Sequence, residues 1–410
     1  MIEYVNRRGS NCYKWDSDHA RGTMPLWVAD MDFKAAPAII EALRKRLEHG
    51  VFGYQYVPQQ YYDSIASWFG RRHGWKGITR DKIIYTIGVV PAISAVLRAL
   101  SDKKKETDGA DARLRVITLT PAYNCFFSSI SNTGCTLLPC RLKETPEEHG
   151  QHFEIDWEDF SVKAAETDVF LLCNPHNPTG RVWTADELRH IAEICRQHDI
   201  FVISDEIHSE FTFPGVHYTP YATVSLTPSY CICVSASKAF NIAGLQCANI
   251  FVPDAGMRAR IDKAINIHEV CDISPFGMEA MMAAYNDSQE WIDELQQVIY
   301  HNYSMLCGFF RERLPELTVT RMEGTYLAWV NIRALLSADY LRDKTPCRCF
   351  SPHSAEEFCS RLAKEEQVLF NHSEMYGAEG YIRINLATSE EILTEAMKRL
   401  ERFVRNGWGA

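Results

Sequence analysis

The 410-residue sequence lacks an excess of positive charge, a long apolar run and any internal repeat. Lysine and arginine number 43 against 53 aspartate and glutamate residues, and the formal net charge is -10 at pH 7. A nucleic acid or an anionic membrane would need a basic surface, so this balance argues against both partners. No apolar run approaches a membrane span, and the first residues lack the apolar core of a signal peptide. We therefore expect a soluble, cytoplasmic protein.

Cysteine is abundant, at 14 residues, but the spacing typical of disulfide frameworks or zinc sites is missing. Cys347 and Cys349 have no second pair at zinc-ligand spacing, so we expect no metal. Four other cysteines lie in apolar, strand-like runs, as free thiols do in a reducing cytosol: Cys173, Cys231, Cys233 and Cys247.

The middle of the chain alternates apolar strand candidates with amphipathic helices. The strand candidates are almost continuously apolar, which is typical of a mostly parallel sheet covered on both faces. A capping-box pattern from Thr184 to Glu187 starts a helix between two of them. This βαβ arrangement predicts an α/β domain. The strand candidates are 115–119, 169–173, 200–204, 230–234 and 249–252.

The pattern changes after Asn286. Apolar residues recur every three to four positions and predict one long helix that ends near Pro315. Two further strand candidates follow, at 325–332 and 380–386, and a final helix that we expect to stop at Gly407.

These patterns predict two domains. Residues 49–287 would form a large α/β domain with a mostly parallel sheet. Residues 1–48 and 288–410 would form a smaller α+β domain. Residues 337–353 mix proline, cysteine and charge, which indicates a surface loop.

The sequence around Lys238 indicates that this lysine has a chemical role. It follows the apolar run 230–234 directly, in the sequence Ser235-Ala-Ser-Lys. An unpaired ammonium at the end of a buried strand is costly. A Schiff base with pyridoxal phosphate (PLP) would remove that cost, and Ser235 and Ser237 offer hydroxyl donors to its phosphate. The alternative for an isolated S-x-S-K is a surface lysine that begins a helix.

Further polar groups follow other strand candidates, where ligands bind in open α/β sheets. Asp205 could keep a pyridine nitrogen protonated, although a turn or helix-capping aspartate is the alternative. Asn177 lies between Pro175 and Pro178, which fix the backbone so that its amide could meet a ring hydroxyl. A plain turn is the alternative there.

Three weaker signals complete the set. Gly88-Val-Val-Pro91 begins an apolar helix whose first backbone N–H groups could bind a phosphate. Tyr123 follows a strand and could stack on a cofactor ring, or pack in the core. Arg383 interrupts an apolar strand, which suits bidentate binding of a substrate carboxylate or, alternatively, an edge-strand ion pair.

Over nearly its whole length the sequence resembles the fold-type I PLP enzymes of the class I/II aminotransferase superfamily. The shared motifs are N-P-x-N-P-T-G at 174–180, S-D-E-I-H at 204–208, S-x-S-K at 235–238 and the arginine strand at 381–385. Within that superfamily it is most similar to the MalY/PatB-type carbon–sulfur β-lyases, often named cystathionine β-lyases. That narrower resemblance rests on segments at 27–33, 52–54, 172–183, 237–246 and 323–327.

The resemblance implies roles for individual residues. Lys238 would be the Schiff-base lysine, with Tyr123 as the second catalytic candidate. Arg383 and Asn177 would bind the substrate. The implied cofactor contacts are Tyr54, Val89, Val90, Tyr123, Asn177, Asp205, His208, Ser235, Ser237 and Lys238. His208 stands where many members have tyrosine, and Gln246 where many have a phosphate-binding arginine.

The resemblance also implies a homodimer with shared active sites, in which Tyr54 completes the site of the neighbouring subunit. We expect a PLP-dependent carbon–sulfur β-lyase that converts L-cystathionine or a related cysteine S-conjugate to a thiol (homocysteine), pyruvate and ammonia. An aminotransferase on the same scaffold is the first alternative, because fold alone does not decide the reaction. A regulatory protein-binding module is the second. A nicotinamide-dependent dehydrogenase would need a G-x-G-x-x-G turn, which the sequence lacks.

Overall fold

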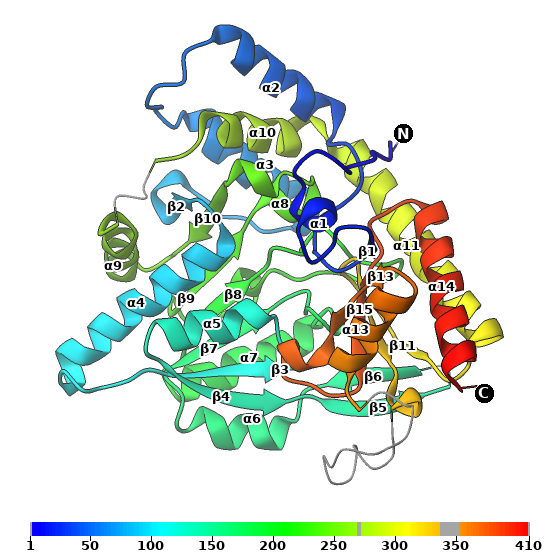
Figure 1. Cartoon of the computed structure of the whole chain (residues 1–410). Coiled ribbons are helices and arrows are strands. Elements are labelled where there is room, and N and C mark those ends of the chain that lie inside the picture. The colour runs from blue at the N-terminus through cyan, green and yellow to red at the C-terminus, as the bar shows by residue number, and fades with distance from the viewer. Residues whose placement is uncertain (1, 149, 269–271, 337–352, 409–410) are drawn as a thin grey trace.

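The computed structural model describes residues 2–148, 150–268, 272–336 and 353–408. Its centre is a seven-stranded sheet (Figure 1). Only β10 runs antiparallel to its neighbours in this sheet, so the predicted mostly parallel sheet is confirmed. In spatial order the strands are β2 (Ile83–Thr86), β10 (Ala248–Phe251), β9 (Tyr230–Val234), β8 (Phe201–Asp205), β7 (Val169–Cys173), β3 (Arg115–Thr120) and β4 (Thr136–Arg141).

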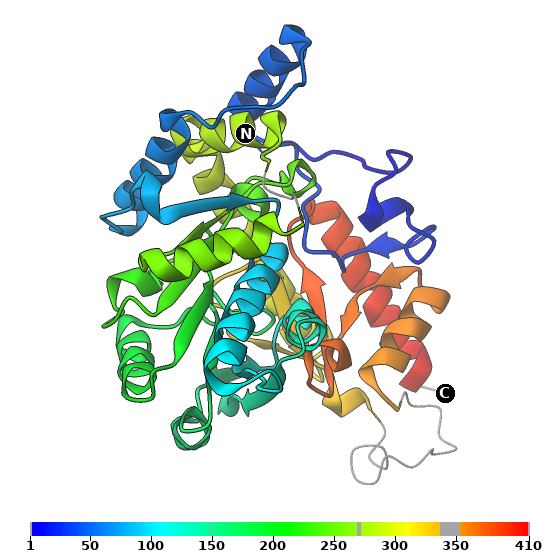
Figure 2. The ribbon, with the colours of Figure 1, turned by 90° about the vertical axis from the view of Figure 1, so that its left-hand side faces the viewer.

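The central strands are apolar along their whole length because each of their faces meets a different core. In β7, Phe170 and Leu172 belong to one buried cluster, while Val169 and Leu171 belong to another. Helices α4 (Val89–Asp108), α5 (Asn124–Asn132) and α9 (Ala255–Asn266) cover the second face, and Figure 2 looks onto this layer. Helix α7 (Ala185–Gln197) packs in the first core and begins at the predicted capping box of Thr184 and Glu187.

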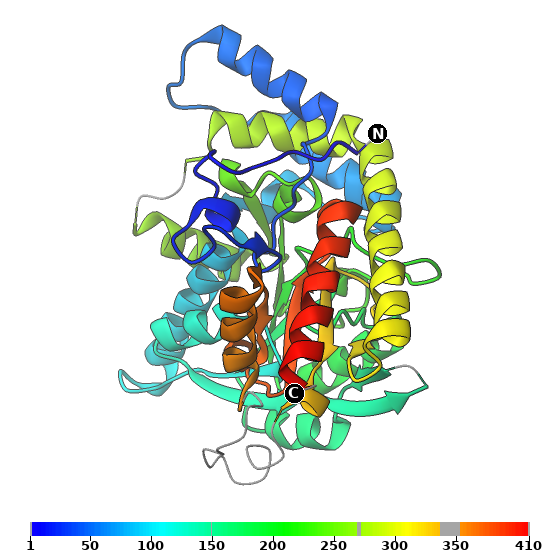
Figure 3. The same cartoon turned by 45° about the vertical axis from the view of Figure 1, so that its right-hand side comes forward.

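A second sheet of six strands lies beside the first. Helices α11 (Gln289–Arg313) and α14 (Glu390–Trp408) run side by side along it (Figure 3). Strands β5 and β6 belong to this sheet although they lie within residues 49–287, so the chain passes between the two sheets more than once. The strands in spatial order are β14 (Asn371–His372), β15 (Tyr381–Asn385), β12 (Leu327–Asn331), β11 (Thr318–Thr320), β6 (Gly150–Glu154) and β5 (Lys143–Glu147).

The remaining elements connect or flank these sheets. Helix α2 (Pro37–His49) packs on α10 (Pro275–Asp287) at the top of Figure 1. Strand β1 (Met24–Pro25) pairs in parallel with β13 (Val368–Leu369). The other helices among the described residues are α1 (Tyr13–Asp16), α3 (Gln59–His73), α6 (Trp157–Ala164), α8 (Ala236–Ala239) and α13 (Ala355–Glu365), with short 3-10 turns η1 (Arg80–Lys82), η2 (Tyr221–Thr223), η3 (Ala243–Leu245), η4 (Arg333–Leu335) and η5 (Ser373–Tyr376).

The predicted stop of the last helix at Gly407 was wrong, because α14 continues to Trp408. Glycine costs a helix about 1 kcal/mol relative to alanine, and a helix whose face is buried tolerates that cost. Leu400 and Phe403 of α14 are buried in the core. The predicted loop 337–353 lies outside the described residues except for His353, and so do Cys347 and Cys349. No helix among the described residues has the length and apolar character needed to cross a membrane.

A buried ion pair joins α1 to Asp32, eighteen residues later in the N-terminal segment. Lys14 Nζ lies 2.8 Å from Asp32 Oδ2, and both side chains are fully buried. The indole N–H of Trp15 donates to Asp32 Oδ1 at 2.8 Å. The second carboxylate oxygen is therefore also satisfied, as a buried charge requires.

We predict that Lys14→Met lowers the free energy of unfolding by about 3–5 kcal/mol, because it leaves Asp32 as a buried charge without its main partner. Equilibrium denaturation in urea measures this loss. The control is Lys34→Met, which removes an exposed pair with Glu3 and should cost less than about 1 kcal/mol. Equal losses in the two variants would contradict this account of the ion pair.

Candidate active site

The polar residues predicted from separate parts of the sequence meet at one cavity. Its volume is about 210 Å³, and it lies where the carboxyl ends of the parallel strands converge, the usual ligand site of open α/β sheets. Most of the predicted contacts line it: Val89, Val90, Tyr123, Asn177, Asp205, His208, Ser235, Ser237 and Lys238. The fold therefore brings together residues that are up to 149 positions apart (238 − 89) in the chain.

Each of these side chains reaches the cavity because a strand ends there. Asp205 is the last residue of β8, and Lys238 follows β9 in the short helix α8. Tyr123 comes after β3, at the residue that caps α5. Gly88 caps α4, so the first N–H groups of that helix face the cavity at Val89 and Val90.

Lys238 is surrounded by protein but faces the cavity. Its Nζ donates a hydrogen bond of 2.6 Å to the backbone carbonyl of Ala29. Burial lowers the pKa of Lys238, the charge of Arg383 acts in the same direction, and Asp30 and Asp205 oppose them. A lysine with a lowered pKa holds more of the neutral amine at physiological pH, which is the form that acts as a nucleophile or base.

Asp205 and His208 are both buried and titrate in unusual ranges. Burial raises the pKa of Asp205 to about 7, although the N–H of Ile207 and the charge of Lys238 favour its charged form. Burial, together with the charges of Lys238 and Arg383, lowers the pKa of His208 to about 3. The imidazole is therefore neutral at physiological pH, and its Nδ1 has no hydrogen-bond partner among the described residues.

The end of the cavity near α4 is suited to an anion. Gly88 closes tightly on the first turn of α4, since a Cβ there would lie 3.3 Å from the ring of Pro91. Ser235 donates its hydroxyl proton to the carbonyl of Cys247 at 2.7 Å and accepts the N–H of Ser237 at 3.0 Å. Val89 and Val90 at the start of α4 and Ser237 line the cavity, so their backbone N–H groups and the Ser237 hydroxyl are the candidate donors at this end.

Arg383 connects the second sheet to Asn177, which lines the cavity. It lies in β15, is 3% exposed, and donates to Asn177 Oδ1 at 3.1 Å and to the carbonyl of Trp27 at 2.9 Å. Its guanidinium carbon stands 4.8 Å from the centre of the Tyr376 ring. Its buried Nε has no partner in the part of the chain that the structure describes, which leaves a donor for a further acceptor.

Two predicted site residues do not line the cavity: Arg383, which contacts its lining residue Asn177, and Tyr54. Tyr54 lies between α2 and α3, and its side chain is 95% exposed. The predicted role of Tyr54 places it in the neighbouring subunit's site, so a single chain does not test it. Gln246 also does not line the cavity, and its backbone is left-handed with a φ of 52°.

Sequence reasoning missed the contribution of Ala29, whose backbone carbonyl accepts the Lys238 hydrogen bond. Ile207, Cys173 and Cys247 also line the cavity without having been assigned to it. The segment 27–33 had been noted for its resemblance, but a backbone acceptor leaves no mark in the residue type. Only the side chains that donate to this segment, such as those of Lys238 and Asn385, could have indicated its role in the sequence.

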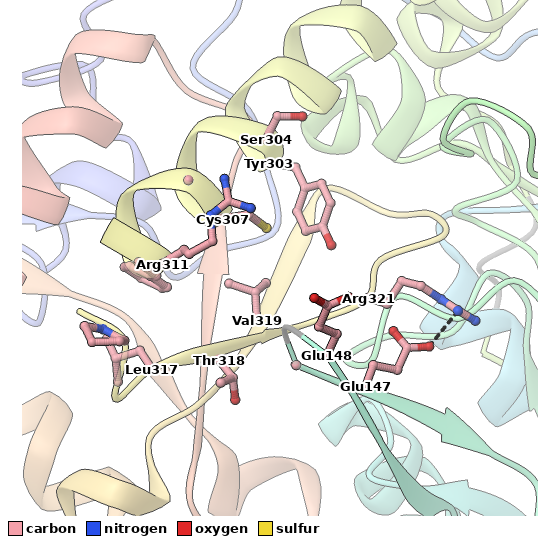
Figure 4. Close-up of a pocket in the computed structure, with 14 residues that line it drawn as sticks. Glu147, Glu148, Tyr303, Ser304, Cys307, Arg311, Leu317, Thr318, Val319 and Arg321 are labelled. Atoms are coloured by element: carbon pink, nitrogen blue, oxygen red, sulfur yellow. Dashed lines mark hydrogen bonds and ion pairs between the residues drawn. The ribbon is translucent and has the colours of Figure 1, made fainter. Parts of the chain in front are cut away.

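A second, larger cavity of about 680 Å³ lies between α11 and β11 (Figure 4). The Arg321 guanidinium, which faces it, is paired with Glu147 at 2.6 Å. None of the described residues that line it is a lysine or a histidine. Within the described ranges no group of three or more histidine, cysteine, aspartate or glutamate side chains is placed to hold a metal ion. The smaller cavity at Lys238 is therefore the candidate active site.

Comparison with known proteins gives consistent results for sequence and structure. The family model for aminotransferase class I and II matches residues 21–400. Cystathionine beta-lyase PatB of Bacillus subtilis is 32% identical over 405 residues, which cover 96% of this chain and 97% of PatB.

Two solved structures have the same fold over their whole length. Cystalysin of Treponema denticola, which contains a pyridoxal 5'-phosphate cofactor, gives a TM-score of 0.87 at 29% identity and covers 99% of each chain. A PLP-bound C-S lyase of Staphylococcus hominis gives a TM-score of 0.85 at 27% identity, also with 99% of each chain covered.

We predict that Asp205→Asn stabilises the cofactor-free protein at high pH. Because the folded pKa is raised, the folded state holds a proton between about pH 4 and pH 7 that the unfolded state has lost. Stability is therefore lost as the pH rises through this window, and the full penalty applies above it. The variant should gain roughly 2–3 kcal/mol more at pH 8 than at pH 5.

Thermal and urea unfolding at the two pH values measure this difference. Asp186→Asn, which changes a carboxylate that is 93% exposed, is the matched control and should give the same small effect at both. If the stability gain of Asp205→Asn did not depend on pH, burial would not penalise the ionised form of the Asp205 carboxylate.

Proposed function

The chain belongs to the class I and II aminotransferase family, and we propose that it is a PLP-dependent carbon–sulfur β-lyase. Its substrate would be L-cystathionine or a related cysteine S-conjugate. With water, cystathionine would give homocysteine, pyruvate and ammonia. The observation that carries the proposal is the joint placement of Lys238, Asp205 and the α4 N-terminus around one cavity. The full-length similarity to PatB and cystalysin supports the choice of reaction.

The residues of the cavity fit PLP. Asp205 is a buried carboxylate whose pKa is raised by burial, and a protonated ring nitrogen would be a cationic partner for it. The unpartnered Nδ1 of His208 and the amide of Asn177 offer polar contacts to the ring substituents. Tyr123 would stack on the ring, and the N–H groups at Val89 and Val90 would bind the phosphate.

When bound, PLP withdraws electrons from the α-carbon of the amino acid attached to it. Lys238 would hold the cofactor covalently through Nζ and, once displaced by the substrate amine, take the α-proton as a general base. The lowered pKa of Lys238 favours the neutral amine that this step needs. The thiolate would leave from the β-carbon, which separates this reaction from transamination.

Arg383 would bind the α-carboxylate of the substrate. Its Nη1 donates to Asn177 Oδ1 at 3.1 Å, and its Nε is free of partners in the described part of the chain. A carboxylate that took up these donors would form the charge-assisted, bidentate contact that arginine favours. Asn177, at the boundary between carboxylate and ring, would contact both.

The described cysteines are free thiols, and most are buried. Such thiols suit a reducing compartment, so the cytoplasm is the proposed location. We also propose the division into a large domain of 49–287 and a small domain of 1–48 and 288–410. Strands β5 and β6 lie within the residue range of the large domain but pair in the six-stranded sheet of the small one.

We predict that the wild-type protein releases pyruvate and a free thiol from cystathionine without an added keto acid, and that Lys238→Ala abolishes this release. The variant loses both the covalent anchor and the base, so its rate should fall by at least about 1,000-fold. Coupled assays for pyruvate and for thiol measure the two products together.

Lys34→Met is the control, because this lysine forms an exposed pair with Glu3 and should leave the rate unchanged. Circular dichroism establishes that Lys238→Ala is folded. Near-normal pyruvate release by Lys238→Ala would contradict the role of Lys238 as covalent anchor and base. Wild-type turnover that required a keto acid would identify an aminotransferase instead.

We also propose that the chain forms a homodimer with shared sites. The end of α2 and the stretch that joins it to α3 expose large apolar side chains, which in a stable protein mark a surface covered by a partner. They are Leu47, Val51, Phe52, Tyr54 and Tyr56, with exposures of 61%, 61%, 52%, 95% and 73%. Tyr54, the most exposed of them, would reach the cavity of the neighbouring subunit.

We predict that Tyr54→Ala and Lys238→Ala restore activity to each other. In a mixed dimer one site would have both defects and the other site neither. Co-expression of the two variants in equal amounts should therefore recover about a quarter of wild-type activity. Activity no greater than the sum of the separate variants would place Tyr54 outside the partner's site.

A further inference from the structure

Residues 27–33, here called the strap, pass over the cavity at Lys238 and have no regular secondary structure apart from an isolated bridge at Phe33. Every carbonyl of the strap nevertheless accepts a hydrogen bond. Most of the donors are side chains from distant parts of the chain. The strap is therefore held in one conformation by its surroundings rather than by its own backbone pairing.

Asn385 of β15 holds the middle of the strap. Its Nδ2 donates to the carbonyl of Val28 at 2.6 Å and to that of Asp30 at 2.7 Å. Its own Oδ1 accepts the N–H of Ala387 at 2.8 Å, and its backbone N–H donates to Leu26 at 2.9 Å. Asn385 is 1% exposed, and both Nδ2 and Oδ1 of its side-chain amide have hydrogen-bond partners.

The carbonyl between these two belongs to Ala29 and is directed at the reactive lysine. It accepts Lys238 Nζ at 2.6 Å and the hydroxyl of Tyr326 at 3.0 Å. Because Asn385 fixes the carbonyls on both sides of it, the position of the Ala29 carbonyl depends on Asn385. Asn385 itself does not line the cavity.

We propose that Asn385 is a positioning residue for the Lys238 amine. It holds the strap so that the Ala29 carbonyl is the resting acceptor of that amine whenever the amine is not bonded to the cofactor. A base that is released during turnover has to stay within reach of the substrate, because a displacement of the base by about 1 Å can lower the rate about 100-fold. This inference rests on the proposed function, because it assigns Lys238 a proton-transfer step.

The chain offers a matched control for Asn385. Asn302 of α11 is also 1% exposed, and its Nδ2 also donates to two carbonyls, those of Leu386 at 2.8 Å and Thr388 at 2.9 Å. It does not contact the strap. Asn385→Ala and Asn302→Ala therefore remove the same kind of buried amide and the same number of carbonyl contacts, and only the first loosens Ala29.

The experiment compares the two variants as holoenzymes and after removal of the cofactor. In the holoenzyme, Asn385→Ala should lower kcat by at least about tenfold with KM within about threefold, while Asn302→Ala changes neither by more than about threefold. In the cofactor-free protein, an amine-directed acylating reagent should modify Lys238 about tenfold faster in Asn385→Ala than in wild type. Mass spectrometry of the Lys238 peptide measures this rate.

If Asn385→Ala does not fold, Asn385→Asp keeps the shape and the acceptor for Ala387 but loses both donors to the strap, and the same changes are expected. Equal effects of the Asn385 and Asn302 variants on kcat, or an unchanged rate of Lys238 modification, would overturn the proposal. The rate of Lys238 modification does not depend on turnover, so it tests only whether Asn385 holds the strap. Absence of pyruvate release by the wild type would instead overturn the proposed function.

Discussion

The hydrogen bond from Lys238 to the Ala29 carbonyl is the contact on which the arrangement of the site depends. An amine enclosed by protein needs an acceptor, and here the acceptor is a backbone group from a segment more than two hundred residues earlier in the chain. The strap is thereby joined to the end of β9. Most of its other carbonyls accept side-chain donors: Asn241, which follows Lys238 by three residues, and Asn371, Arg383 and Asn385 of the second sheet. The Asp32 carbonyl accepts the backbone N–H of Val5.

The same segment relates the two sheets to each other. Arg383 reaches from β15 to both the strap and Asn177, so the group proposed to bind the substrate carboxylate is held by the loop after β7. The ion pair of Lys14 and Asp32 fixes the far end of the strap. A change in any of these contacts would alter the distance between the proposed carboxylate site and the reactive lysine.

Much of this molecule follows from the sequence because it depends on local patterns. Apolar runs covered on both faces identified the central strands, and the capping box located the start of α7. The residues after each strand could be grouped because parallel strands end at one edge.

Other features depend on contacts that a local pattern does not encode. The end of α14 was missed because packing of its face outweighed the effect of Gly407. The pairing of β6 with β11 joins residues near 150 and 320, and neither segment carries a signal for its partner. The Ala29 carbonyl is a backbone group, so its role became visible only through the side chains that surround it. Tyr54 is 95% exposed in a single chain, and its role concerns a second one.

The pairing of β1 with β13 has a consequence for how the chain folds. Met24 pairs with Val368, and the strap that follows is held by residues up to Asn385. During synthesis residues 24–33 therefore remain without these partners until the segment up to Asn385 has left the ribosome. Contacts of such long sequence separation form late, because closing a long loop costs entropy before the contact repays it. Strand β1 and the strap are thus synthesised long before the residues of β13 and β15 that fix them in place.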